Sequence, residues 1–267
     1  MITDADFEQI VSYMKREAGI DFSNKRTLVT TRLESYFSKI GCHDPKLYLE
    51  QAMGSSTGQE MESLINLLTT NHTFFWREEK HFEFLQQEVL PELKKKCATT
   101  RDIRIWCAAS SSGEEPYTLA MVLMSYFGNE QALWDTTVLA TDISTKVLRR
   151  AQQGVYAKES IKNLPVDWQM RFFTRQADSV TVIPELKEQV LFRKLNLMDP
   201  FPFRKKLHVI FARNVLIYFN EDVKTRVVEK MVDSLVPGGY LFIGTTESVS
   251  KNTNRLEYVM PSVYRKK

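Results

Sequence analysis

Apolar residues in the first part of the chain recur at the spacing of amphipathic helices. The first helix is predicted by an apolar stripe, by a capping box that Thr3 and Asp6 form at its start, and by Gly19 at its end. Further stripes predict a helix over residues 23–40 and another after it, with the apolar members Val29, Leu33, Tyr36, Phe37, Ile40, Met61, Leu64, Ile65 and Leu68. We therefore expect an all-α N-terminal domain over residues 1–70.

After this region, short apolar runs rich in β-branched residues alternate with helical patterns. Such alternation predicts an α/β domain with a parallel sheet, which we place at residues 71–267. The predicted strands are residues 103–108, 137–140, 207–211 and 240–243. The predicted helices are residues 114–127, 144–152 and 221–235, the last ended by Pro237 and the two glycines after it.

Two more β-rich runs interrupt the alternation. Residues 180–183 and 190–193 flank Pro184, which predicts a small antiparallel β insertion at about residues 176–194. In open α/β sheets, ligands bind at the carboxyl ends of the strands, where the strand order reverses. We therefore expect the functional side chains directly after the predicted strands.

Composition and local charge exclude several classes of protein. The 267 residues are 43% hydrophobic and 26% charged, as in ordinary globular proteins. The longest apolar run, residues 119–124, is far shorter than the roughly 18 residues of a membrane-spanning helix. Asp4, Asp6 and Glu8 stand where a secretory signal carries positive charge, so we expect a cytoplasmic protein without membrane insertion. The three cysteines lack metal-binding spacing, so we expect no metal and no disulfide framework.

Positive charge is clustered along the chain. Residues 146–176 hold seven Lys and Arg and residues 187–206 hold six, whereas residues 105–145 hold none. This distribution predicts a basic surface beside a neutral or acidic pocket. A plain solvated surface and a surface for an acidic protein partner are both open interpretations. Because no nucleic-acid-binding motif accompanies the charge, we expect no nucleic-acid partner.

The first predicted strand is followed by a turn of small residues that leads into an acidic helix start, A-A-S-S-S-G-E-E-P-Y at residues 108–117. Gly113 is the only glycine of this turn, whereas the dinucleotide fingerprint needs three, so a nicotinamide oxidoreductase is excluded. Glu114 and Glu115 favour an ammonium or sulfonium ligand. Alternatively, they are helix-dipole residues on a surface turn.

The second predicted strand ends in A-T-D-I-S. This places Asp142 where a carboxylate can accept hydrogen bonds from both ribose hydroxyls of a nucleoside ligand. A helix N-cap is an equally good interpretation of Asp142. Together, the acidic turn and Asp142 favour a nucleoside cofactor without a pyrophosphate, such as S-adenosylmethionine.

The chain also contains five characteristic blocks: T-N-H-T-F-F-W-R-E, I-W-C-A-A-S-S-S-G-E-E-P-Y-T-L-A-M, A-T-D-I-S, L-N-L-M-D and F-A-R-N-V-L-I-Y-F. With the helical N-terminal region, these blocks resemble the bacterial chemotaxis-receptor methyltransferases, the CheR family, over the whole chain. The resemblance implies a Rossmann-like class I S-adenosylmethionine-dependent methyltransferase domain behind an all-α domain. It implies cofactor contacts at Asn71, Thr73, Arg77, Glu115, Asp142, Asn196, Leu197, Asn214 and Val215.

These residue types suit the chemistry of the cofactor. Glu115 suits the ammonium group and Asp142 the ribose. Asn196 and Asn214 offer paired donors and acceptors for an adenine edge or for a backbone clamp.

Arg77 and Tyr218 are the candidates for orienting the substrate carboxylate, and the resemblance places Tyr218 near the reacting centre. A guanidinium near a sulfonium is repulsive unless a carboxylate lies between them, and the alternative for Arg77 is a surface ion pair with a neighbouring glutamate. His72 and Trp76 depart from the residues that many relatives carry, which affects expectations about substrate more than about cofactor.

The implied reaction is the methylation of glutamate side chains on chemoreceptor cytoplasmic helices, which gives methyl esters and S-adenosylhomocysteine. We expect a monomer whose second helix docks acidic receptor helices through Lys25, Arg32 and Lys39. The predicted insertion lacks the glycine-rich turn of peptide-binding members, so we expect no pentapeptide tether. The alternatives are a methyltransferase acting on a small molecule, a nucleic acid or another non-receptor substrate, and a cofactor-binding signalling module without turnover.

Overall fold

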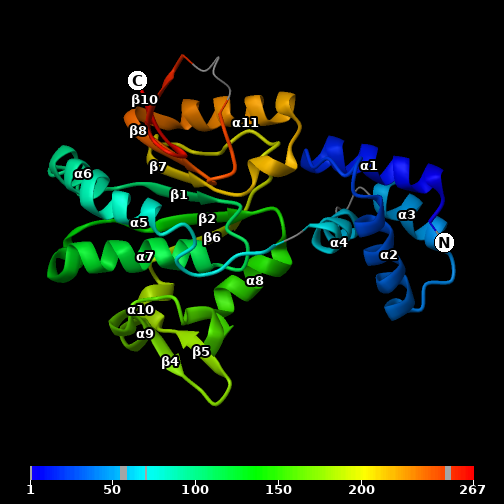
Figure 1. The fold of residues 1–267 in the computed structure, drawn as a ribbon, viewed down its shortest axis with the longest axis horizontal. Helices are drawn as coiled ribbons and strands as arrows, with labels where there is room; N and C mark the ends of the chain where they lie inside the picture. The colour runs from blue at the N-terminus through cyan, green and yellow to red at the C-terminus, as the bar shows by residue number, and fades with distance from the viewer. Residues whose placement is uncertain (1, 55–58, 70, 250–253) are drawn as a thin grey trace.

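Among the described residues, four helices form the N-terminal part of the chain, on one side of the molecule (Figure 1). The computed structural model describes residues 2–54, 59–69, 71–249 and 254–267, with residues 59–61 described by their backbone alone. The helices are α1 (Asp4–Ala18), α2 (Arg26–Ile40), α3 (Pro45–Gly54) and α4 (Gln59–Leu68). Their apolar faces enclose a core of their own, which includes Ile10, Met14, Val29 and Leu33.

The ends of α1 confirm the sequence prediction. Thr3 and Asp6 form the capping box, and Gly19 ends the helix with a φ of 72°. α2 begins at Arg26, later than predicted, because Ser23 donates its N–H and its hydroxyl to the carboxylate of Asp21, at 2.9 and 2.6 Å. The start of the predicted helix is therefore an Asp-centred turn.

The other N-terminal helices differ from the prediction in one respect. α4 confirms the last predicted helix, although the side chain of Met61 and all of Thr70 lie outside the described residues. α3 was not predicted, since only Leu49 and Ala52 of its ten residues are buried and its apolar stripe is short.

In the described part of the chain after α4, a seven-stranded sheet has the order β6-β2-β1-β7-β8-β10-β9. The strands are β1 (Ile105–Ala108), β2 (Val138–Asp142), β6 (Val190–Lys194), β7 (Leu207–Ala212), β8 (Leu235–Ile243), β9 (Leu256–Met260) and β10 (Val263–Lys266). The first five in the sheet are parallel, and β10 and β9 add antiparallel pairs at one edge. The chain runs outward from β1 in both directions, so the reversal of strand order lies between β1 and β7.

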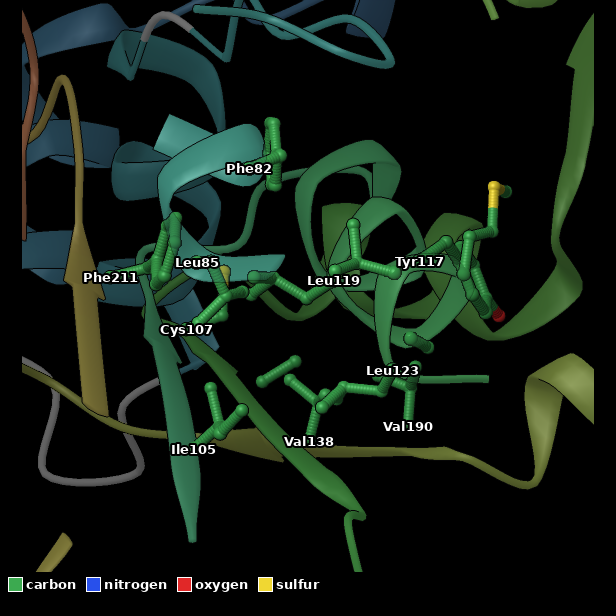
Figure 2. Packing of buried hydrophobic residues seen from close by; sticks show 14 of the residues in the cluster. Phe82, Leu85, Ile105, Cys107, Tyr117, Leu119, Leu123, Val138, Val190 and Phe211 are labelled. Carbon is green, nitrogen blue, oxygen red and sulfur yellow. The ribbon is translucent and has the colours of Figure 1, made fainter. Parts of the chain in front are cut away.

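Helices cover both faces of this sheet (Figure 1). α7 (Glu114–Phe127) covers one face together with α5 (Lys80–Phe84), the π-helical turn η1 (Leu85–Val89) and α6 (Leu90–Lys96). α11 (Glu221–Ser234) covers the other face. Successive side chains of β1 point to opposite faces of the sheet. Ile105 and Cys107 pack with α7 (Figure 2), and Trp106 and Ala108 pack with α11. The strands are therefore buried on both sides, as parallel strands usually are.

The predicted strands and helices of this domain are present, with shifted ends. α7 has the predicted bounds, and α8 (Thr145–Gln153) and α11 each lie within one residue of theirs. β8 begins at Leu235 and runs through Pro237, although the prediction started this strand after the glycines. The α5–α6 region and the β9–β10 pair were not predicted.

The predicted β insertion was wrong in its extent. The small antiparallel sheet has the order β3-β5-β4 and consists of β3 (Val155–Ala157), β4 (Phe173–Arg175) and β5 (Ser179–Val182), with the 3₁₀ turn η3 (Lys158–Ile161) and α9 (Val166–Phe172) between β3 and β4. The second run predicted for it is β6, which pairs in parallel with β2 in the large sheet. The short helix α10 (Pro184–Lys187) separates the two runs and leads the chain from one sheet to the other.

No helix among the described residues is long and apolar enough to cross a membrane.

Candidate active site

A cavity of about 300 Å³ lies at the carboxyl ends of β1, β2, β6 and β7, the position expected for ligands of an open α/β sheet. The N-terminal part of the chain lines its other side with Ala18, Ile20, Phe22, Lys25, Leu28 and Thr69. The structure brings all the predicted site residues together at this cavity: Asn71, Thr73, Arg77, Glu115, Asp142, Asn196, Leu197, Asn214, Val215 and Tyr218. Their individual roles stay predictions.

The turn after β1 is shaped to let a ligand approach the backbone. Ala109 and Ser111 have φ values of 55° and 50°, in the left-handed region that most residues avoid. Gly113 follows with a φ of 99°, and a Cβ there would stand 2.8 Å from the Cβ of Ala151 and 2.9 Å from the hydroxyl of Tyr156. The glycine therefore lets α7 start against α8 and β3, while the strained turn faces the cavity.

Asp142 ends β2 with a buried, hydrogen-bonded carboxylate. Its Oδ2 accepts the N–H of Ser111 at 2.8 Å and its Oδ1 accepts the N–H of Ser144 at 2.9 Å. Burial raises the pKa of Asp142 above the usual 3.8. The N-cap of α8 is Ser144, whose hydroxyl accepts the N–H of Val147, so the N-cap interpretation of Asp142 is wrong. Each carboxylate oxygen has a further lone pair, which suits a pair of ribose hydroxyls.

Glu115 projects from the first turn of α7 and is paired inside the protein. Its Oε2 lies 3.0 Å from Nη1 of Arg213, and its Oε1 accepts from the thiol of Cys107 at 3.3 Å. Burial raises the pKa of Glu115 above 4.5, and the guanidinium opposes that rise. Glu114 is buried as well and accepts from the hydroxyl of Ser112 at 2.7 Å. The surface-turn interpretation of these two glutamates is therefore wrong.

Arg213 is a residue of the site that the sequence analysis missed. Its side chain is fully buried at the end of β7 and lies 3.3 Å from Oε2 of Glu78 as well as near Glu115. It also donates to the carbonyl of Arg77. The sequence contains a signal for this residue: in the F-A-R-N block, a charged arginine directly follows the six buried residues of β7. Arg213 thus ties α7 to the segment that carries Arg77.

The segment before α5 divides its side chains between the cavity and the core. Arg77 lines the cavity, donates to the carbonyl of His72 at 3.1 Å and lies 5.6 Å from the ring centroid of Phe74. His72 lines the cavity too. Trp76 instead is partly buried and stacks on Phe82 of the core, with ring centroids 5.3 Å apart. Its departure from the family pattern is therefore a matter of packing.

The two predicted asparagines act as clamps between segments. Asn196 donates to the carbonyl of Glu17 at 2.6 Å and accepts from the N–H of Met198 at 3.0 Å. Through these contacts Asn196 holds the end of α1, and its role toward the cofactor stays a prediction. Asn214 has a φ of 58° and donates to Oε1 of Glu78 at 3.4 Å.

Tyr218 lies where the N-terminal helices meet the sheet. It belongs to the 3₁₀ turn η4 (Leu216–Tyr218), and its carbonyl accepts the N–H of Asp21 at 3.0 Å. The ammonium of Lys25 stands 5.3 Å from the centroid of its ring. Burial raises the pKa of Tyr218 above 10, so its phenol is protonated at neutral pH.

The basic stripe predicted on the second helix is divided among three environments. Lys25 lines the cavity, and Lys39 is exposed. Arg32 donates to the carbonyls of Leu68 and Thr69, at 2.6 and 3.0 Å, and so holds the end of α4. The stripe as a whole is therefore not a single docking face.

Two family profiles together match almost the whole chain. The profile described as "CheR methyltransferase, SAM binding domain" matches residues 71–264, and the one described as "CheR methyltransferase, all-alpha domain" matches residues 5–69. The chain belongs to the CheR methyltransferase family. It is an S-adenosylmethionine-dependent methyltransferase, and the predicted class I fold behind an all-α domain is confirmed.

Relatives align along nearly their full length. The chemotaxis protein methyltransferase of Borreliella burgdorferi is 39% identical over 270 residues, which cover 99% of this chain and 95% of the relative. Chemotaxis protein methyltransferase 2 of Vibrio cholerae is 35% identical over 255 residues, which cover 94% of this chain and 88% of the relative. A solved glycopeptide N-methyltransferase, MtfA, aligns with only 14% identity and a TM-score of 0.32 over 57% of this chain and 48% of its own, too distant to support any inference.

The cavity of this CheR-family chain fits S-adenosylmethionine on its own evidence. Ser110 lines the cavity and is only 2% exposed, and its hydroxyl has no hydrogen-bond partner among the described residues. A buried hydroxyl without a partner is costly unless a ligand or water satisfies it. The acids Glu115 and Asp142 line the same cavity, and their residue types suit a cationic group and a ribose, so the donor set fits the cofactor.

Proposed function

We propose that the chain methylates glutamate side chains on the cytoplasmic helices of chemoreceptors and produces glutamate methyl esters. The observation that supports this most directly is the pairing of two kinds of groups in one cavity. Buried acids at the sheet edge suit a cationic nucleoside cofactor, and Arg77 with Lys25 supplies positive charge for an anionic substrate. A carboxylate acceptor fits this arrangement better than an amine, which the two cations would repel.

The chemistry requires no general base. S-adenosylmethionine supplies an electrophilic methyl group when bound. A glutamate with the usual pKa near 4.3 is ionised at neutral pH and has a lone pair ready for attack. Transfer of that methyl group to the carboxylate oxygen would leave the electron pair of the broken carbon–sulfur bond on sulfur, and would give the ester and S-adenosylhomocysteine.

The protein's contribution is to position the carboxylate and to exclude water. Arg77 pairs with the substrate carboxylate, and the protonated Tyr218 donates a hydrogen bond to the same group. The apolar residues Ile20, Phe22 and Leu28 line the opposite side of the cavity and limit hydration of the nucleophile. Attack in line with the departing sulfur then depends on how rigidly these side chains are held.

The N-terminal helices are proposed to receive the receptor helix. Because Arg32 is used to hold α4, we assign electrostatic contact with the acidic receptor to Lys25 at the cavity and to Lys39 on the exposed face. We further propose that a single copy of the chain acts on the receptor and that no receptor-tail pentapeptide tethers it.

A transfer assay tests the proposal. The protein is incubated with cofactor labelled in the methyl group and with membranes from its host, and receptor bands are then treated with mild base. Label in the receptor that is released as methanol supports glutamate esters. Label that resists base would indicate another acceptor. Binding of S-adenosylhomocysteine without any transfer would indicate a cofactor-binding module without turnover.

A further inference from the structure

Two loops at the carboxyl edge of the sheet carry half of the predicted site residues. The β6 loop, residues 195–199, carries Asn196 and Leu197, and the β7 loop, residues 213–218, carries Asn214, Val215 and Tyr218. Apart from the short turn η4, neither loop belongs to a helix or a strand. Each loop has a few backbone hydrogen bonds of its own, and side chains from other elements add to them.

Glu247 holds the β7 loop through its carboxylate. Its Oε2 accepts the N–H of Asn214 at 2.8 Å and the N–H of Gly244 at 2.6 Å, and its Oε1 accepts the N–H of Ile217 at 3.1 Å. A side chain on Gly244 would collide with the amide of Asn214 and stand 2.8 Å from Oε2 of Glu247. Gly244 leaves room for Asn214, and the Glu247 carboxylate binds its N–H, so together they keep Asn214 in its left-handed conformation.

Lys230 holds the β6 loop with the opposite charge. From α11 its ammonium donates to the carbonyls of Leu197, Met198 and Asp199, at 2.5, 3.1 and 2.9 Å. The ammonium has three protons, and these three carbonyls can use all of them. It also lies 4.6 Å from the ring centroid of Phe201, which covers it.

We propose that Glu247 and Lys230 are positioning residues for methyl transfer, each fixing one of the two loops on which the cofactor rests. Neither is one of the described residues that line the cavity, so each acts through the loop that it holds. The part that concerns methyl transfer to a receptor rests on the proposed function. The part that concerns cofactor binding does not.

Cofactor affinity is the first test for Glu247. We expect Glu247→Ala to weaken S-adenosylhomocysteine binding about tenfold or more, measured by calorimetric titration well below the melting temperature, because three charge-assisted hydrogen bonds are lost. Glu247→Gln keeps one oxygen for Asn214 and Gly244 but turns an N–H toward Ile217, so its loss should be smaller. If the alanine variant does not fold, the glutamine variant alone decides the test.

A matched carboxylate separates positioning from stability. Glu92 also accepts three hydrogen bonds, from Lys96, Tyr240 and Arg265, but belongs to α6 and holds the antiparallel edge of the sheet. Glu92→Gln should lower the melting temperature without changing cofactor affinity. If the Glu247 variants, like this control, have a lower melting temperature but unchanged cofactor affinity, the positioning role of Glu247 is overturned.

For Lys230, the corresponding pair is Lys230→Met and Lys266→Met. Lys266 donates to two carbonyls at the end of α11, those of Val232 and Leu235, at 2.7 and 2.8 Å. We expect about tenfold weaker S-adenosylhomocysteine binding in the first variant and unchanged binding in the second. Equal affinities in the two variants would overturn the role of Lys230.

Kinetics with a receptor substrate complete the test. Because Tyr218 lies on the β7 loop, Glu247→Gln should lower kcat at saturating cofactor by more than twofold while the KM for the receptor stays unchanged. A rise in receptor KM with kcat unchanged would overturn this part of the proposal. Failure of the wild type to methylate any receptor would overturn the proposed function instead, and the titrations would still stand.

Discussion

The cavity has two walls of opposite character. The sheet-edge wall presents buried charged groups, Glu115, Asp142 and Arg213, each with partners inside the protein. The helical wall, as far as the structure describes it, presents mainly apolar side chains, together with Thr69 and the ammonium of Lys25. Buried charges need hydrogen-bond or ion-pair partners within the protein before a ligand binds, and these partners make the sheet-edge wall rigid and specific. Apolar contacts are less directional, so the helical wall can tolerate movement of a bound partner. We therefore propose that the sheet edge recognises the cofactor and that the helical wall encloses the reaction.

The largest expected effect comes from removing acids of the sheet-edge wall. Asp142→Ala and Glu115→Ala should each weaken S-adenosylmethionine binding by about 1.5–3 kcal/mol, since each deletes a charged hydrogen-bond partner. Calorimetric titration measures the loss and circular dichroism checks the fold. Asp135→Ala, at the opposite end of β2, is the control and should bind normally. Unchanged affinity in both site variants would falsify the assignment of this wall.

A stability experiment tests the helical wall. Arg32→Met should lower the free energy of unfolding by about 1–3 kcal/mol, because it removes charged hydrogen bonds to the carbonyls of Leu68 and Thr69. Lys39→Met, in the last turn of the same helix and exposed, should change it by less than about 0.5 kcal/mol. Denaturant unfolding measures both. Equal effects would show that Arg32 is a surface residue after all and would restore the single docking stripe.

The pH dependence of cofactor binding sharpens the comparison further. Burial raises the pKa of Glu115 above 4.5 and that of Asp142 above 3.8, so both protonate at a higher pH than exposed carboxyls do. Cofactor affinity should therefore fall as the pH is lowered through these raised values, and binding there should release protons. Titrations in buffers of different ionisation enthalpy measure that release. Glu115→Gln should release fewer protons, and an unchanged number would exclude Glu115 as a titrating contact.

The smallest expected effect is on peptide binding. The turn between β4 and β5 is short and closed, because the N–H of Gln176 donates to the carbonyl of Ser179 at 2.9 Å and the hydroxyl of Ser179 donates back to its side chain at 2.9 Å. A fluorescence titration with the receptor-tail pentapeptide should show no saturation at micromolar concentration. Saturable binding that is competed by unlabelled peptide would show that the small sheet is a binding site for a receptor tether.

The sequence predicted elements whose signals are local. Thr3, Asp6 and Gly19 lie within or beside α1 and specify its ends through their own hydrogen bonds, so that helix was predicted in full. Strand pairing is not local. Residues 180–183 and 190–193 have the same β-rich character, and nothing within them distinguishes a partner in the small sheet from β2 in the large one.

The same distinction applies to the site. Residue types and the family resemblance identified residues that the structure places at one cavity. The sequence did not reveal which other residues these side chains contact. Arg213 meets Glu78 from 135 residues away, and Asn196 meets the carbonyl of Glu17 from 179 residues away. The first contact depends on packing within the α/β domain and the second on how the N-terminal helices meet that domain, and no periodicity encodes either. A charged residue at the end of a buried strand is the signal that would have pointed to Arg213.

Gly19 also sets the spacing between the two walls. A methyl group at this position would stand 2.6 Å from the sulfur of Met198, 3.1 Å from Val223 and 3.3 Å from Phe219. Gly19 therefore allows the end of α1 to pack closely against the loop after β6 and the start of α11. A larger side chain would move the end of α1 away from the loop after β6, so the separation of the two walls depends on a residue that is not among the described residues lining the cavity.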